Sequence, residues 1–74
     1  MHRVIHFEIY TNAPETVQPF YEKVFGWKFQ KFEGGPMEYW TITTGADEEP
    51  GINGGITRPR PGQSAGTLNT IAVE

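Results

Sequence analysis

The sequence predicts an α+β domain: a βαβββ unit with one helix on a curved, mixed β-sheet, followed by a C-terminal strand. Residues 3–10 alternate between two kinds of side chain, as strands do, whereas residues 13–25 carry apolar side chains at helical spacing. Aromatic and β-branched residues dominate the later segments. The chain divides into the βαβββ unit at 1–57, a linker at 58–66 and a last strand within 67–74.

The first strand has one apolar face and one mixed face. Successive side chains of a strand point to opposite sides of the sheet. The apolar face therefore consists of Ile5, Phe7 and Ile9. The mixed face consists of Val4, His6, Glu8 and Tyr10. We expect the apolar face to pack beneath the helix and the mixed face to lie on the concave side of the sheet.

The helix, expected from Ala13 to about Phe25, has start and stop signals. Asn12 is a suitable N-cap, and Glu15, three residues later, completes a pair that resembles a capping box. Gly26 stands where a left-handed C-terminal cap is expected. A proline at position 19 predicts a local kink, because it removes one backbone hydrogen bond. The stripe expected to face the sheet consists of Val17, Phe20, Tyr21 and Val24.

Turn-forming residues separate the remaining strands. We expect a second strand at 27–32, a turn at Gly34-Gly35-Pro36 and a third strand at 37–44. An acidic, solvated loop at 45–51 leads to a fourth strand at 52–57.

Side chains alternate along the third strand, so we expect Tyr39 on the concave side and Trp40 with Ile42 beneath the helix. In the fourth strand, Gly54 and Gly55 indicate a bulge or a close backbone approach. No helix follows these glycines, so they do not form a phosphate-binding loop.

Composition argues against several classes of function. The net charge of −3, the pI near 5.3 and the scattered basic residues provide no surface for nucleic acid. The short apolar runs and the absence of a signal-peptide pattern predict a cytoplasmic protein with no membrane partner. A chain of 74 residues without cysteine has a thin stability margin and no disulfide to strengthen it. Association with another chain is the means of stabilisation that remains.

Residues 3–26, together with Trp27, resemble the opening of the vicinal oxygen chelate superfamily, which includes glyoxalase I, bleomycin-resistance proteins and extradiol dioxygenases. The resemblance implies a βαβββ module. Members of the superfamily usually pair two such modules, and this chain holds about one. Residues 67–74 would then be the first strand of a second module, either missing from a truncated domain or exchanged with another molecule.

In metal-dependent members that resemble this chain, a histidine lies near the middle of the first strand, where this sequence has His6. Glu8 follows on the same face. The resemblance implies further ligands at positions occupied here by Gly55 and by Leu68 or Asn69, which supply none. We therefore expect no metal within one chain, because one imidazole and one carboxylate do not fill a typical site. A divalent metal is compatible with the sequence only if two chains share it.

Each candidate residue has a functional and a structural interpretation. His6 and Glu8 are the candidate catalytic pair, with His6 as general base or substrate anchor, or else a half-buried strand histidine beside a solvated carboxylate. Tyr10 and Tyr39 are candidates for substrate binding, or else core aromatics. The linker pair Arg58 and Arg60 either clamps a carboxylate or solubilises the chain.

Two functions follow from the resemblance and remain open. The first is a metal-free, small-molecule-binding module of the bleomycin-resistance type that uses the concave face of its sheet. The second is a metal-dependent, glyoxalase-like lyase or isomerase, or a dioxygenase, with His6 as ligand or base. In either case we expect a two-fold homodimer with exchanged C-terminal strands, because a unit this small leaves a sheet edge and a face uncovered.

Overall fold

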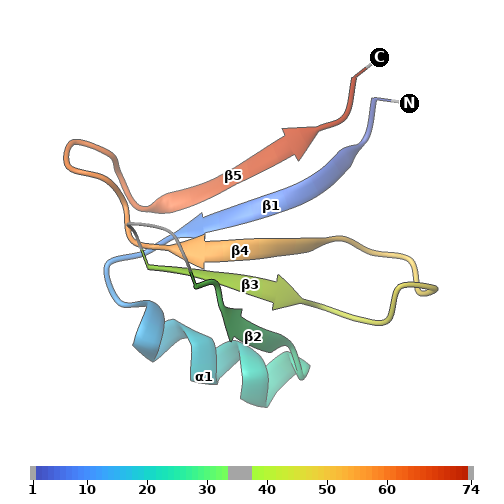
Figure 1. Ribbon diagram of the computed structural model, residues 1–74, viewed down its shortest axis with the longest axis horizontal. Coiled ribbons are helices and arrows are strands. Elements are labelled where there is room, and N and C mark those ends of the chain that lie inside the picture. The colour runs from blue at the N-terminus through green and yellow to red at the C-terminus, as the bar shows by residue number, and fades with distance from the viewer. Residues whose placement is uncertain (1, 34–37, 74) are drawn as a thin grey trace.

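In the computed structural model, which describes residues 2–33 and 38–73, one helix packs on one side of a five-stranded sheet (Figure 1). The elements are β1 (Val4–Tyr10), α1 (Pro14–Phe25), β2 (Lys28–Lys31), β3 (Tyr39–Thr43), β4 (Asn53–Thr57) and β5 (Gly66–Ile71). The strand order is β2-β3-β4-β1-β5, in which β1 and β4 are parallel and the other neighbours are antiparallel.

This architecture confirms the predicted α+β class and the order of the elements. It is compatible with a βαβββ module followed by a further strand. In this chain β5 pairs with β1 of the same molecule, and its exchange with a partner stays a prediction. The turn predicted at Gly34-Gly35-Pro36 lies outside the described residues.

The helix spans the predicted residues but begins differently. Ala13 occupies the N-cap position without a side-chain hydrogen bond, and its own N–H donates to Thr11 Oγ1 at 3.2 Å. The prediction that Asn12 caps the helix is therefore wrong. At the other end Gly26 has a φ of 73° and donates its N–H to the Glu22 carbonyl, which confirms the left-handed cap. The helix continues through Pro19.

The face that α1 turns toward the sheet is also rotated from the predicted stripe. Phe20 and Val24 are 58% and 54% exposed, so the prediction that they pack on the sheet is wrong. The least exposed residues of the helix are instead Pro14, Val17, Gln18 and Tyr21. The Tyr21 ring stacks on Trp27, with centroids 4.9 Å apart, and Trp27 packs against Phe7 of β1 at 5.9 Å. The helix thus turns Tyr21 toward Trp27 and leaves Phe20 and Val24 exposed.

The centre of the sheet lies in β3 and β4, where Ile42 and Ile56 are 1% and 0% exposed. A Cβ atom built on Gly54 would overlap the carbonyl oxygen and the ring of Phe7 on one side. A Cβ atom built on Gly55 would overlap the hydroxyl of Tyr39. The pairing of β4 with β1 runs in register through both glycines, so the predicted bulge is wrong and the close approach is confirmed.

The irregularity in the sheet lies in β1 instead. The register against β5 shifts between Val4 and His6, which leaves Ile5 as an extra residue and places Val4 opposite Ile71. Because Asn69 faces Phe7 across the same ladder, Ile71 and Val4 both point to the helix side. The prediction that Val4 shares the concave face with His6 is therefore wrong.

The close packing at β4 predicts a specific cost for adding one methyl group. Gly54→Ala should lower the free energy of unfolding by about 2 kcal/mol, because the new Cβ would force apart the backbones of β1 and β4. Gly45→Ala is the matched control, since its Cβ would meet only the flexible end of the Glu49 side chain at 3.2 Å. Urea unfolding of both variants measures the difference. Equal stability of the two variants would contradict this packing.

Candidate functional site

All four residues proposed from the sequence gather on the side of the sheet opposite α1. The Tyr10 hydroxyl donates to Glu8 Oε1 at 2.6 Å, and the Tyr39 hydroxyl donates to Glu8 Oε2 at 3.2 Å. His6 Nε2 lies 3.8 Å from Glu8 Oε2. The strand parity predicted for His6, Glu8 and Tyr10 is therefore correct, as is the placement of Tyr39 on the same side of the sheet, opposite the helix.

Gly55 of β4 makes this cluster possible. Strand β4 lies between β3, which carries Tyr39, and β1, which carries Glu8. Gly55 pairs with Glu8 on one side and with Thr41 on the other. Since Gly55 has no side chain, the Tyr39 phenol lies across β4 and reaches the carboxylate on β1. The space above Gly55, the position at which the family resemblance implied a metal ligand, is thus filled by the Tyr39 phenol from the neighbouring strand.

Glu8 and the two phenols line one wall of a cavity of about 230 Å³. Its other lining residues are Thr57, Arg60 and Gln63. Arg60 and Gln63 belong to a turn held by two hydrogen bonds, one from the Gln63 N–H to the Arg60 carbonyl and one from the Arg60 N–H to Gln63 Oε1. The cavity therefore combines a carboxylate, two phenols and a guanidinium group.

The two linker arginines have separate roles, so they do not form the clamp considered above. Arg58 Nη2 lies 2.7 Å from Glu15 Oε2 and Arg58 Nε lies 3.2 Å from Glu38 Oε1. Arg58 Nη1 also donates to the Asn12 carbonyl. These contacts join the start of the helix to the strands, and only Arg60 lines the cavity. Sequence reasoning missed Thr57 and Gln63 because neither stands in a motif.

The two phenols beside Glu8 have raised pKa values. The pKa of Tyr10 lies above its usual 10.0 because of its hydrogen bond to Glu8, then burial, then the Glu8 charge. Gln63 and Arg60 act in the opposite sense on Tyr10, as expected of groups in the same cavity. The pKa of Tyr39 is raised by burial first and then by the charge and hydrogen bond of Glu8. Both hydroxyls are therefore protonated donors at neutral pH.

Glu8 keeps capacity for further hydrogen bonds. A carboxylate has about four lone-pair directions, and two of them are used by the phenols. The Glu8 side chain is 26% exposed and the His6 side chain 36% exposed. The 3.8 Å between His6 Nε2 and Glu8 Oε2 is longer than a hydrogen bond. Within residues 2–33 and 38–73, no three His, Cys, Asp or Glu residues converge into a metal-binding group.

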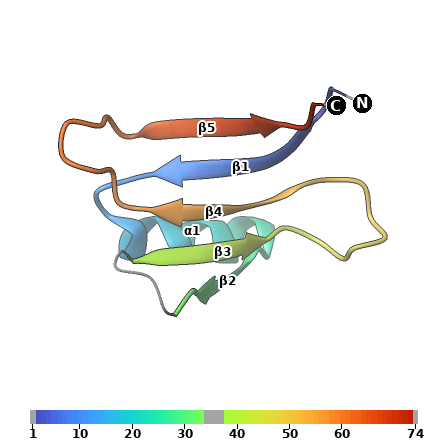
Figure 2. The same ribbon diagram turned by 45° about the horizontal axis from the view of Figure 1, so that its top comes forward.

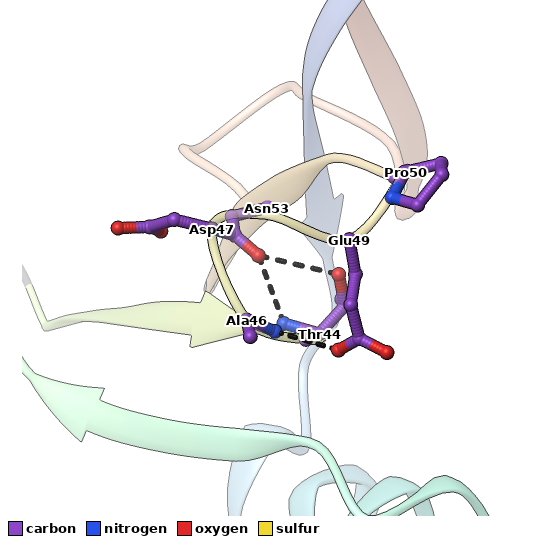
Figure 3. Close-up of a pocket in the computed structure, with 8 residues that line it drawn as sticks. Thr44, Ala46, Asp47, Glu49, Pro50 and Asn53 are labelled. Carbon is purple, nitrogen blue, oxygen red and sulfur yellow. Dashed lines mark hydrogen bonds between the residues drawn. The ribbon is translucent and has the colours of Figure 1, made fainter.

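A second cavity, of about 190 Å³, lies in the loop between β3 and β4 (Figure 3). Here the Thr44 N–H donates to Asn53 Oδ1 at 2.9 Å, and the Ala46 N–H donates to Glu49 Oε1 at 3.0 Å. Figure 3 shows these bonds running across the loop between the residues that line it. The polar groups serve to close the loop, so we do not assign a site there.

The chain matches no protein-family model and no curated protein. Among the described residues, no helix is long and apolar enough to cross a membrane. What distinguishes the candidate site is its geometry, in which one carboxylate is held by two phenols from different strands beside a cavity.

The raised pKa values predict a loss of stability in alkaline solution. A group whose pKa is higher in the folded state stabilises the protein below its unfolded pKa, here 10.0, and loses this effect as the pH rises through the folded pKa. The unfolding free energy should therefore fall as the pH rises beyond about 10. Tyr39→Phe should reduce this pH dependence, as measured by urea unfolding across the alkaline range.

Tyr21→Phe provides the control, because Tyr21 stacks on Trp27 on the other side of the sheet. This variant should keep the pH dependence of the original chain. An identical alkaline profile for Tyr39→Phe and the original chain would contradict the proposed coupling to Glu8.

Proposed function

We propose that this chain is a metal-free, small-molecule-binding module that takes its ligand in the cavity beside Glu8, as proteins of the bleomycin-resistance type use a concave sheet. The observation that carries the proposal is the Glu8 carboxylate, fixed by the Tyr10 and Tyr39 hydroxyls at 2.6 and 3.2 Å in the wall of the cavity. Few convergent polar groups in a concave site are typical of ligand recognition.

The lining residues define the chemistry of the ligand. Glu8 accepts hydrogen bonds and favours a cationic or N–H-bearing group, whereas the guanidinium of Arg60 favours an anionic or carbonyl group. The rings of Tyr10 and Tyr39 offer surface to a short apolar or planar portion. A cavity of about 230 Å³ is small beside the roughly 300–1,000 Å³ of drug-sized sites. We therefore propose a small ligand that carries both kinds of group.

The phenols contribute by fixing Glu8 before the ligand arrives. A side chain already held in one position loses less conformational freedom on binding, which favours affinity. Because the phenols come from β1 and β3, the carboxylate is tied to two strands of the sheet rather than to a loop.

A second candidate function is a metal-dependent, glyoxalase-like lyase or isomerase, or a dioxygenase, in which His6 acts as ligand or base. The proximity of His6 to Glu8, 3.8 Å apart, favours it, because an imidazole and a carboxylate are two of the donor types that such a metal site uses. This function needs donors beyond that pair. Metal analysis of the purified protein separates the two candidates: bound metal at one equivalent or one half-equivalent per chain would support the enzyme.

Binding of small charged probes tests the proposed site. In heteronuclear NMR titrations with free amino acids, alkylamines and alkylcarboxylates, we expect the strongest shifts from the amino acids, which carry both groups. The shifts should centre on Glu8, Tyr10, Tyr39 and Arg60. Glu8→Gln and Arg60→Gln should each weaken the binding of the responding probe by about tenfold or more, because each removes a charged partner.

His6→Gln is the matched control, since His6 lies beside Glu8 but does not line the cavity. It should leave the affinity nearly unchanged. Shifts that centre on the loop around Asp47, or equal affinity in Glu8→Gln, would contradict the proposed site.

A further inference from the structure

The helix covers only part of one side of the sheet. Figure 2 shows α1 behind β3 and β4, with no element behind β1 and β5. On the side that elsewhere forms the core, Val4 of β1 is 40% exposed and its cross-strand partner Ile71 of β5 is 55% exposed. The helix itself exposes Phe20 and Val24. We call these four residues the apolar step, because α1 stands beside an uncovered strip of the same sheet.

The exposed area of the chain is larger than a monomer of its size should have. The accessible surface is 5549 Å², whereas about 4,600 Å² is expected of a folded monomer of 8.3 kDa. The excess of about 950 Å² is close to the roughly 800 Å² that each partner buries in an interface of standard size. Among the described residues, the hydrophobic side chains that are buried are Ile42 and Ile56. The single chain thus leaves uncovered about the area that a dimer needs.

A second copy of the chain fits the shape of this surface. A helix layer beside an uncovered strip is complementary to itself under a two-fold rotation, which places each α1 over the partner's β1 and β5. The remaining β5 residues on that side, Thr67 and Asn69, are uncharged, so that strand buries no charge in the contact. The apolar step of one protomer would then contact the apolar step of its partner.

We propose that the chain forms a two-fold homodimer through the apolar step, with α1 of each protomer packed on the uncovered β1 and β5 strip of its partner. In this arrangement β5 stays paired with β1 of its own chain, so the proposal replaces the strand exchange expected from the sequence. The cavity beside Glu8 lies on the opposite side of the sheet and stays open to solvent. The dimer is therefore independent of the proposed ligand site.

Sedimentation equilibrium of the 74-residue chain at micromolar concentration tests the proposal, with a dimer as the expected result. Ile71→Lys should raise the dissociation constant of the dimer at least tenfold, because it buries a charge in an apolar contact. Leu68→Lys is the matched control: Leu68 lies on the same strand with 54% exposure, but it faces the concave side opposite Glu8. This variant should remain a dimer.

The helix provides an independent pair of variants. Phe20→Lys should dissociate the dimer as Ile71→Lys does, whereas Glu22→Lys, exposed elsewhere on α1, should not. Phe20 and Ile71 are exposed in the single chain, so the dissociated variants should keep the circular dichroism spectrum of the folded protein. Isotope-filtered NMR on a mixed-label sample should show contacts between Phe20 of one copy and Ile71 of the other.

Three results would overturn the proposal. One is a folded monomer at micromolar concentration, which would leave the apolar step to a different partner. Another is a dimer that Leu68→Lys dissociates and Ile71→Lys does not. The third is a dimer without intermolecular contacts between Phe20 and Ile71.

Discussion

Two adjacent residues without side chains, Gly54 and Gly55 in β4, are the constraint on which both the sheet and the candidate site depend. Side chains of neighbouring strand residues point to opposite sides, so the two glycines open space on both sides of the same strand. The Phe7 ring fills the space on the helix side and the Tyr39 phenol fills the space on the concave side. The glycines thereby allow aromatic groups from β1 and β3 to approach the backbone of the strand between them.

This arrangement links the core to the chemistry of the concave face. On the helix side, Phe7 packs against Trp27, on which Tyr21 of the helix stacks. On the other side, the Tyr39 hydroxyl donates a hydrogen bond to Glu8. A larger residue at position 55 would occupy the path of the phenol, so glycine at this position allows Tyr39 to hold the Glu8 carboxylate. A carboxylate held in this way supports the proposal of ligand binding through hydrogen bonds.

The features predicted correctly from the sequence are those that local patterns determine. The alternation in β1 placed Glu8 and Tyr10 on one side, and glycine at position 26 indicated the end of the helix. The features predicted wrongly depend on contacts outside the pattern that predicted them. The helical spacing around Phe20 does not indicate that Tyr21 stacks on Trp27, which lies beyond the end of the helix.

The start of the helix and the rim of the cavity are further examples. Asn12 does not cap the helix, and its carbonyl accepts a hydrogen bond from Arg58, 46 residues further along the chain. Thr57 and Gln63 line the cavity only because the strand order brings the end of β4 beside Tyr10. Such contacts follow from the fold and leave no local signal in the sequence.

A double-mutant cycle between Gly55→Ala and Tyr39→Ala tests most directly whether Gly55 leaves the space that the Tyr39 phenol occupies. Gly55→Ala alone should destabilise the chain, because its Cβ overlaps the Tyr39 hydroxyl. In the Tyr39→Ala background the same change should cost nothing or stabilise the strand, giving a coupling free energy of about 1–2 kcal/mol in urea unfolding. If the free-energy costs of the two single variants add up to the cost of the double variant to within about 0.5 kcal/mol, the account is contradicted.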